Sequence, residues 1–250
     1  MGIRLIGKLE EIRNYWSMRA EGYSESIIDE FETNKAEHWK DVILNHVDTD
    51  RPLKILDVGT GPGFFPILLG REGHKVTAVD YTEAMLEEAE KNCRRYNVCA
   101  DFSKMDAHSL EFDDDSFDLI LSRNLIWDLE NPKKAYAEWL RVLKPEGKMM
   151  VFDGNHYLHL YDNDYADAHK IGSGEVEHRY IKNVDSNIIK DIAKELPLSK
   201  ERRPQWDVNT LIEMGVRSVK VDTDGKDSYC VQCNGEDVYL PFSFMICVTK

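Results

Sequence analysis

A glycine-rich turn flanked by acidic residues is the most chemically suggestive feature of the sequence. The turn is segment 56–63 (LDVGTGPG), which ends the apolar stretch 53–58 and precedes an apolar helix predicted at 64–71. Glycines permit a tight turn and let a ligand approach the backbone without a Cβ in the way. Asp80 ends the next apolar stretch, and a carboxylate at that place accepts hydrogen bonds from both hydroxyls of a ribose. The pattern therefore favours a ligand that contains a nucleoside.

Spacing separates two classes of such ligands. The dinucleotide fingerprint G-x-G-x-x-G requires a glycine at position 64, where this chain has Phe64. Asp57 stands before the turn, where a carboxylate would repel the phosphates of a dinucleotide but suits a ligand with a positive centre and an amino group. These features favour S-adenosylmethionine as the cofactor and leave a nicotinamide oxidoreductase as the alternative.

The elements that must position these residues alternate between short apolar strands and helices. Strands are predicted at 53–58, 75–80, 100–105, 117–122 and 148–153, and helices at 64–71, 82–97 and 132–143. A short helix at 208–214 and strands at 217–222 and 241–248 follow. Strands that alternate with helices predict βαβ units, a parallel sheet and hence an α/β fold.

Two segments fall outside this alternation, within what we expect to be a single domain over residues 1–250. Residues 1–50 are predicted to be helical, with Ser24 as the N-cap of an amphipathic stretch through Val47. Residues 154–205 follow the fifth strand, and an insertion there lies over the ligand crevice of an open α/β sheet. We therefore expect this second segment to be a substrate cap.

Five ordered blocks make residues 50–153 resemble the class I S-adenosylmethionine-dependent methyltransferases, in the group with the methyltransferase domain 11 pattern. Besides LDVGTGPG, the blocks are VTAVD at 76–80, SKMDA at 103–107, FDDDSFDLI at 112–120 and WLRVLKPEGK at 139–148. The last block departs from the family's LKPGG turn by having Glu146 in place of the first glycine. The resemblance implies a Rossmann-like, seven-stranded, mostly parallel sheet of order 3-2-1-4-5-7-6 with its last strand antiparallel.

The resemblance also implies roles in binding S-adenosylmethionine. Asp57 would bind its amino group directly or through water, Asp80 its ribose hydroxyls and Asp106 its adenine amine. Segment 15–23 resembles the family's leading helix, a lid that folds over the cofactor, although a helix-packing stripe of aromatic residues would look the same. The residues expected at the cofactor are Tyr15, Arg19, Tyr23, Asp57, Gly59, Thr60, Gly61, Gly63, Asp80, Tyr81, Met85, Met105, Asp106, Ala107, Ser122, Arg123 and Asn124.

The methyl acceptor is expected to be a small polar metabolite with a nitrogen, oxygen or sulfur acceptor atom. Segment 122–125 reads SRNL, not the DPPY or NPPY of base-directed and glutamine-directed N-methyltransferases, and it lacks a cysteine nucleophile. The net charge of −14 disfavours nucleic acid as a substrate. His156 and His159 in the cap are the predicted catalytic bases, with a metal pair or polar surface as the alternatives. A protein that binds the cofactor without turnover would show the same motifs.

Composition limits the remaining possibilities. No stretch approaches the roughly 18 apolar residues of a membrane helix, and the N-terminus lacks the apolar run of a signal peptide. The five cysteines are too scattered for a disulfide framework, so Cys230 and Cys233 are interpreted as structural thiols. We therefore expect a cytoplasmic protein with no metal and no nucleic-acid or membrane partner; the oligomeric state stays open.

Overall fold

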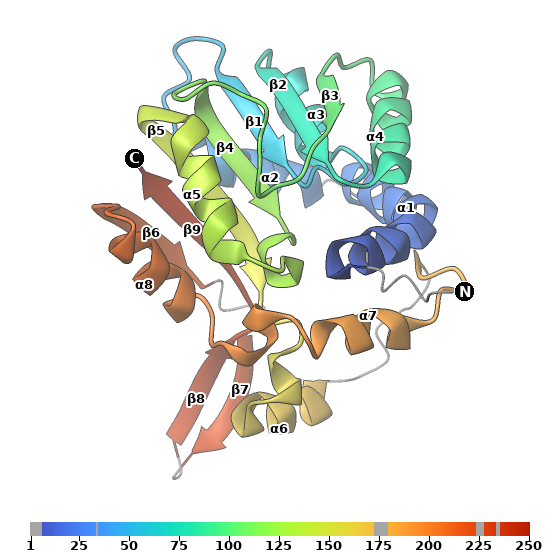
Figure 1. Ribbon diagram of the computed structural model, residues 1–250, viewed down its shortest axis with the longest axis vertical. Coiled ribbons are helices and arrows are strands. Elements are labelled where there is room, and N and C mark those ends of the chain that lie inside the picture. Colours follow the sequence, from blue (N-terminus) through green and yellow to red (C-terminus); the bar gives the residue numbers. More distant parts are fainter. Residues whose placement is uncertain (1–6, 34, 173–179, 224–227, 234–235) are drawn as a thin grey trace.

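The computed structural model describes residues 7–33, 35–172, 180–223, 228–233 and 236–250. It contains a seven-stranded sheet in the order β3-β2-β1-β4-β5-β9-β6 (Figure 1). The strands are β1 (Lys54–Val58), β2 (Lys75–Asp80), β3 (Asp101–Lys104), β4 (Phe117–Arg123), β5 (Leu143–Gly154), β6 (Ser218–Asp222) and β9 (Ser243–Thr249). The first five pair in parallel, whereas β9 is antiparallel to both β5 and β6. Since β9 is the seventh strand of this sheet, the predicted order and the antiparallel last strand are confirmed.

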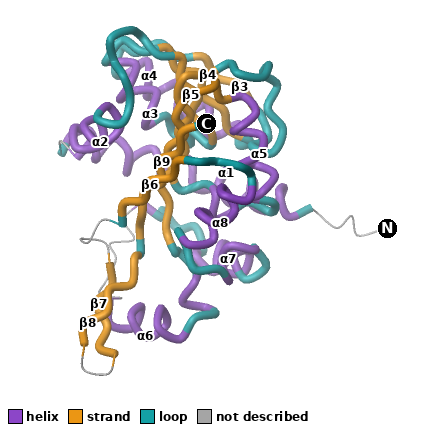
Figure 2. Tube along the Cα trace, turned by 90° about the vertical axis from the view of Figure 1, so that its left-hand side faces the viewer, coloured by secondary structure: helices purple, strands orange, loops and turns teal. Residues whose placement is uncertain are grey.

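Helices cover both faces of the sheet (Figure 2). On one face lie α2 (Lys35–Leu44), α3 (Phe64–Arg71) and α4 (Glu83–Arg95), and on the other lie α5 (Pro132–Val142) and α8 (Gln205–Glu213). Along β4, Ile120 packs into the core beneath α5, whereas its neighbours Leu119 and Leu121 pack into the core beneath α3. Because both faces are buried, the central strands are continuous apolar runs, which is the pattern that located them in the sequence.

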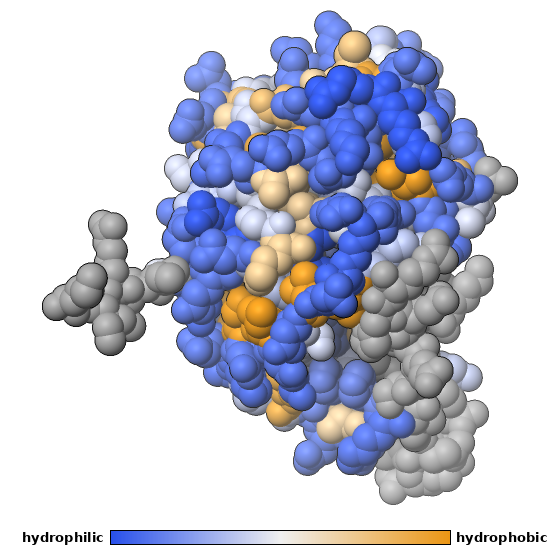
Figure 3. Space-filling view, turned by 90° about the vertical axis from the view of Figure 1, so that its right-hand side faces the viewer, coloured by the Kyte–Doolittle hydropathy of each residue, from blue (hydrophilic) through white to orange (hydrophobic). Residues whose placement is uncertain are grey.

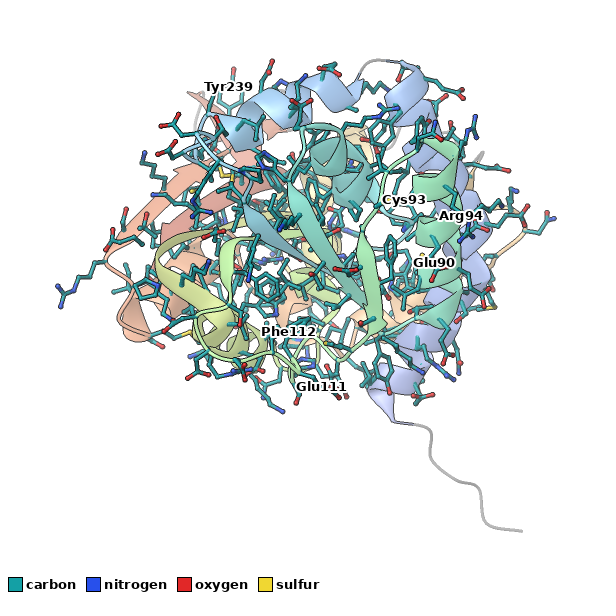
Figure 4. All side chains as sticks on the ribbon, turned by 90° about the horizontal axis from the view of Figure 1, so that it is seen from above. Glu90, Cys93, Arg94, Glu111, Phe112 and Tyr239 are labelled. Atoms are coloured by element: carbon teal, nitrogen blue, oxygen red, sulfur yellow. The ribbon has the colours of Figure 1, made fainter. Side chains whose placement is uncertain are left out.

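The amphipathic pattern of α4 fixes which side of that helix faces the sheet. Cys93 is buried on the inner side, whereas Glu90 and Arg94 lie on the outer side and form an ion pair of 3.2 Å (Figure 4). Thr82 occupies the N-cap position of α4, although its side chain makes no capping hydrogen bond.

The N-terminal segment is helical, but its division into helices differs from the prediction. A single helix, α1 (Lys8–Glu32), passes through Ser24, which is buried and accepts a hydrogen bond of 2.9 Å from Nδ2 of Asn92. The prediction that Ser24 begins a helix is therefore wrong. Its hydroxyl pairs with a side chain of α4 and does not cap a helix terminus.

The segment after β5 folds into short helices on the side of the molecule that carries α1. They are the 3-10 helix η2 (Leu158–Leu160), α6 (Asn163–Gly172), α7 (Ser186–Ala193) and the 3-10 helix η4 (Pro197–Lys200). Ile189 and Ile192 of α7 pack with Ile12 and Tyr15 of α1 in one buried cluster. The N-terminal helix and the segment after β5 thus share a small core of their own.

A two-stranded antiparallel hairpin, β7 (Ser228–Cys233) and β8 (Glu236–Pro241), stands apart from the main sheet and beside α6 (Figures 1 and 2). The sequence around Cys230 and Cys233 predicts a strand that runs into an Asn-Gly turn, and in the structure this strand pairs with β8 in a second sheet. The side chains of Cys230 and Cys233 lie outside the described residues, so their role as structural thiols stays a prediction.

A buried ion network joins the end of β5 to α8. The Arg203 guanidinium donates to Asp153 at 2.8 Å and to Asp207 at 2.7 Å, and all three side chains are almost fully buried. Asp207 also accepts a hydrogen bond from the Tyr136 hydroxyl of α5, and Asp153 accepts one from the Trp127 backbone N–H. The network therefore connects the sheet, two helices and the loop after β4.

We expect Arg203→Met to lower the free energy of unfolding by about 3–5 kcal/mol, because it leaves two buried carboxylates without a counter-charge. Urea unfolding followed by circular dichroism measures the change. Arg202→Met is the matched control: this neighbouring side chain is 47% exposed and pairs with surface carboxylates, so we expect a loss below about 1 kcal/mol. Equal losses in the two variants would contradict a stabilising role for the buried network.

Candidate active site

A pocket of about 760 Å³, including space open to solvent, lies where the carboxyl ends of β1, β2 and β4 meet α1. The face of the molecule that carries α1 is mostly hydrophilic, with small groups of hydrophobic residues (Figure 3). This edge of an open parallel sheet is where such folds bind ligands. The predicted cofactor residues that line the pocket are Tyr23, Gly59, Gly61, Asp80, Tyr81, Met85, Met105, Asp106, Ala107 and Asn124.

The glycine turn is bent as its sequence suggests. Gly59 has a φ of +69°, and a Cβ at this position would collide with the Leu125 side chain. Gly63 has a φ of +90° and lies against Ala89 of α4. Both positions therefore require glycine, for conformation and for space.

Asp80 holds this turn in place. One oxygen of its carboxylate accepts the Gly61 N–H at 2.9 Å, and the other accepts the Thr82 N–H at 2.8 Å. The carboxylate thus ties the turn after β1 to the N-terminus of α4, at the wall of the pocket. Burial raises its pKa, whereas these backbone N–H groups lower it in part.

Asp57 lies beneath the turn and is 1% exposed. Its Oδ2 atom has no hydrogen-bond partner among the described residues, and it does not line the pocket. Burial raises the pKa of this carboxyl to about 7, and the nearby Asp80 adds to the shift. Asp57 is therefore poised to be neutralised by a proton or stabilised by a positive group.

The opposite wall comes from α1 and the loop after β4. The indole N–H of Trp16 donates to Oδ2 of Asp128 at 2.7 Å, and Asp128 ends the 3-10 helix η1 (Ile126–Asp128). Neither residue is among the predicted site residues, although Trp16 stands inside the aromatic motif of segment 15–23. The sequence signal for Asp128 is a single acid within the apolar stretch 125–129.

Other lining residues were also not predicted. His108 follows Asp106, and its Nδ1 lies 2.6 Å from Oδ1 of that carboxylate. The remaining ones are Leu9, Ile12, Arg13, Val58, Val79, Thr82, Leu125, Leu129 and Glu130. Most of these are apolar or come from α1, so they could not be found by looking for chemically reactive side chains.

Several predicted residues do not reach the pocket lining. Thr60 and Gly63 lie within the turn, and Ser122 is buried with its hydroxyl bonded to the Val58 carbonyl. Tyr15 and Arg19 bond to each other at 3.0 Å on the side of α1 that meets the segment after β5.

Arg123 is among the residues predicted at the cofactor, but its side chain does not line the pocket. Its guanidinium pairs with Glu30 at 3.0 Å and lies over the rings of Trp39 and Phe64. Successive side chains of a strand point to opposite faces, so Arg123 joins the helices on the α3 side of the sheet. The prediction for Arg123 is therefore corrected.

The two predicted catalytic histidines are not in the pocket lining. His156 lies between Trp127 and Phe242, with its Nε2 3.4 Å from Oδ1 of Asp153. His159 stacks on His169 at 4.0 Å, and burial lowers its pKa to about 4. A base of such low pKa is a poor proton acceptor at neutral pH.

Comparison with known proteins identifies the domain that holds the pocket. A family profile described as a methyltransferase domain matches residues 56–151. The chain contains a class I S-adenosylmethionine-dependent methyltransferase domain. This methyltransferase domain covers β1 to β5 and takes S-adenosylmethionine as its cofactor.

Curated relatives resemble the methyltransferase domain over part of their length. A demethylmenaquinone methyltransferase of Renibacterium salmoninarum is 32% identical over 128 residues, which are 51% of this chain and 52% of that protein. A ubiquinone/menaquinone biosynthesis C-methyltransferase, UbiE, of a Ruegeria species is 34% identical over 46% of this chain and 48% of its own. The chain thus spans about half the length of the curated relatives it matches.

Solved structures extend the likeness in fold over most of the chain. A protein of Pyrococcus horikoshii, PH0226, superposes with a TM-score of 0.56 at 18% identity, over 87% of this chain and 90% of its own. A methyltransferase of Aquifex aeolicus superposes with a TM-score of 0.52 at 20% identity, over 84% and 88%. The Rossmann-like fold therefore extends beyond the methyltransferase domain. No helix in the described part of the chain has the length and apolar character needed to cross a membrane.

The pocket of the methyltransferase domain fits its cofactor in chemistry. S-adenosylmethionine carries a positive sulfonium, an amino group and a ribose. The site offers Asp80 and Asp128 in its walls and Asp57 beneath the turn, and the last two each have a buried oxygen without a hydrogen-bond partner among the described residues. Such oxygens are costly unless a ligand or a proton satisfies them.

We expect the raised pKa of Asp57 to appear in the pH dependence of stability. Between about pH 4 and pH 7 the folded protein binds more protons at this carboxyl than the unfolded chain, so stability falls as pH rises through that range. The side chain at this position of the Asp57→Asn variant cannot ionise. The free energy of unfolding of this variant, relative to that of the natural chain, should therefore increase by about 1–3 kcal/mol from pH 5 to pH 8. Urea unfolding without cofactor measures this difference. A difference that is the same at both pH values would contradict the raised pKa.

Proposed function

We propose that this chain transfers the methyl group of S-adenosylmethionine to a small organic acceptor in the pocket between the strand ends and α1. The observation that carries the proposal is the Asp80 carboxylate at the end of β2, beside the glycine turn in the pocket wall. In the proposed arrangement Asp80 binds the ribose hydroxyls and Asp106 the adenine amine, while Asp57, beneath the turn, binds the amino group through water. Gly59 and Gly61 give the cofactor access to the backbone.

The chemistry needed from the protein is alignment and exclusion of water. The bound cofactor supplies an activated methyl group on a positive sulfur. The chain contributes an apolar wall, Ile12 and Trp16 from α1 and Leu125 and Leu129 from the loop after β4. These residues hold the acceptor in line and keep water from the methyl group.

The acceptor we propose is flat and weakly polar. The curated relatives are named for demethylmenaquinone and ubiquinone/menaquinone, and UbiE is named a C-methyltransferase. The apolar lining near α1 agrees with a ring of that kind better than with the polar metabolite expected from the cap histidines, which do not line the pocket. We therefore propose a ring carbon of a quinol as the acceptor atom.

Cofactor binding tests the first half of this proposal. Asp80→Asn should weaken S-adenosylhomocysteine binding by about 1.5–3 kcal/mol, roughly 10- to 150-fold, because charge-assisted hydrogen bonds to the ribose are lost. Isothermal titration calorimetry measures the affinity. Asp113→Asn, an exposed change in the loop before β4, is the control and should bind as the natural chain does. Tight binding of NAD and none of S-adenosylhomocysteine would overturn the assignment.

Turnover with defined acceptors tests the second half. We expect 1,4-dihydroxynaphthalene, a water-soluble quinol ring, to yield its 2-methyl derivative and S-adenosylhomocysteine in equal amounts, as measured by mass spectrometry. Small amines, alcohols and thiols should give at most a tenth of that rate. A faster reaction with one of these polar acceptors would restore the polar-metabolite prediction. Cofactor binding without turnover of any acceptor would indicate a binding protein.

A further inference from the structure

Asp128 is a buried acid in the pocket wall that has no role in the proposed cofactor contacts. It ends η1, five residues after β4, and is 2% exposed. Its Oδ2 accepts the Trp16 indole N–H, while its buried Oδ1 has no hydrogen-bond partner among the described residues. A buried carboxylate that is half satisfied is costly, so its presence in a pocket wall indicates a ligand or a proton at Oδ1.

The other acids of the pocket wall are already engaged or exposed. Both oxygens of Asp80 accept backbone N–H groups, and Oδ1 of Asp106 accepts the His108 backbone N–H and lies against its ring. Glu130 is exposed to solvent. Among the described lining residues, Asp128 is thus the buried acid with an unused oxygen.

The electrostatic surroundings keep this carboxyl available for a proton. Burial raises its pKa to about 8, the Trp16 hydrogen bond lowers it in part, and the like charges of Asp153 and Asp80 raise it. Charged and titratable groups surround Asp128 from several elements. Those of the helix and the strand ends are Arg13 with its partner Glu10 on α1, Asp80 on β2, and Asp153 with its partner Arg203 at the end of β5. Those of the loops are Asp106 and His108 after β3, Glu130 after η1 and Tyr157 after β5. Of the cations in this set, Arg13 and Arg203 already have acidic partners.

We propose that Asp128 is the general base that removes the proton of the methyl acceptor, and that Trp16 positions it through the indole hydrogen bond. This proposal rests on the proposed function. The acceptor attacks the methyl carbon; the new bond to carbon forms as the carbon–sulfur bond breaks, and the electron pair of that bond stays on sulfur. The acceptor proton passes to Oδ1 of Asp128 and then to water. For a quinol, the hydroxyl proton leaves as the ring carbon attacks; the ring proton is then lost while the carbonyl oxygen regains a proton and aromaticity returns, so one proton is released overall.

A base of this kind sets the pH dependence of the reaction. Only ionised Asp128 accepts a proton, so kcat should rise with pH and level off above about pH 8. Trp16→Phe removes the hydrogen bond that lowers the pKa of Asp128, so its rate profile should shift to higher pH. A residue that served only packing would change the rate without moving the profile.

Asp128→Asn is the central variant, because it keeps the shape and the acceptor for the Trp16 indole but cannot take a proton. We expect kcat with 1,4-dihydroxynaphthalene to fall about 100-fold or more, and S-adenosylhomocysteine affinity to stay within about threefold. Asp113→Asn should match the natural chain in both measurements. Unchanged kcat in Asp128→Asn would overturn the base proposal alone, whereas a natural chain without turnover would overturn the proposed function. A collapse of cofactor affinity would make Asp128 a cofactor ligand and contradict the proposal.

A second measurement needs no turnover. In the cofactor-free protein, the Trp16 indole N–H resonance, assigned through Trp16→Phe, reports the charge of the carboxylate it contacts. We expect its chemical shift to titrate with an apparent pKa near 8 in the natural chain and to stay flat through that range in Asp128→Asn. A flat resonance in the natural chain would overturn the proposal that Asp128 is a base matched to neutral pH.

Discussion

The Asp80 carboxylate is the constraint on which the site depends, because it ties the glycine turn after β1 to the start of α4. Parallel strands end at the same edge of a sheet, so a short acidic side chain at the end of β2 reaches the turn of its neighbour. Gly59 and Gly63 accept the resulting backbone bend, and Leu125 closes over the turn from the loop after β4. Three separate parts of the chain thereby converge on one pocket.

The second half of the pocket depends on α1, which is distant in sequence. Trp16 reaches Asp128 across 112 residues, and the same helix packs with α7 of the segment after β5. Lys182 of that segment pairs with Glu21 and Glu25 on α1 at 2.8 and 2.6 Å. The pocket wall is therefore supported from outside by contacts between two segments that are not part of the sheet.

The sheet order and part of the pocket lining could be predicted from sequence because their signals are local. Apolar runs mark strands buried on both faces, and the glycine turn and Asp80 fall at fixed places relative to them. Arg123 was misplaced because a strand residue changes face with each step along the chain. Asp128 was missed because its significance depends on Trp16, which lies 112 residues away in the sequence. The histidines of the cap were expected at the acceptor on composition alone, which does not fix where a loop side chain points.

The most direct test of this account is a crystal structure of the protein with S-adenosylhomocysteine. We expect the ribose hydroxyls within hydrogen-bond distance of Asp80, the adenine beside Asp106, and the sulfur facing the wall formed by Trp16, Leu125 and Asp128. Binding of the ligand at another place, or a ribose that does not contact Asp80, would contradict the account.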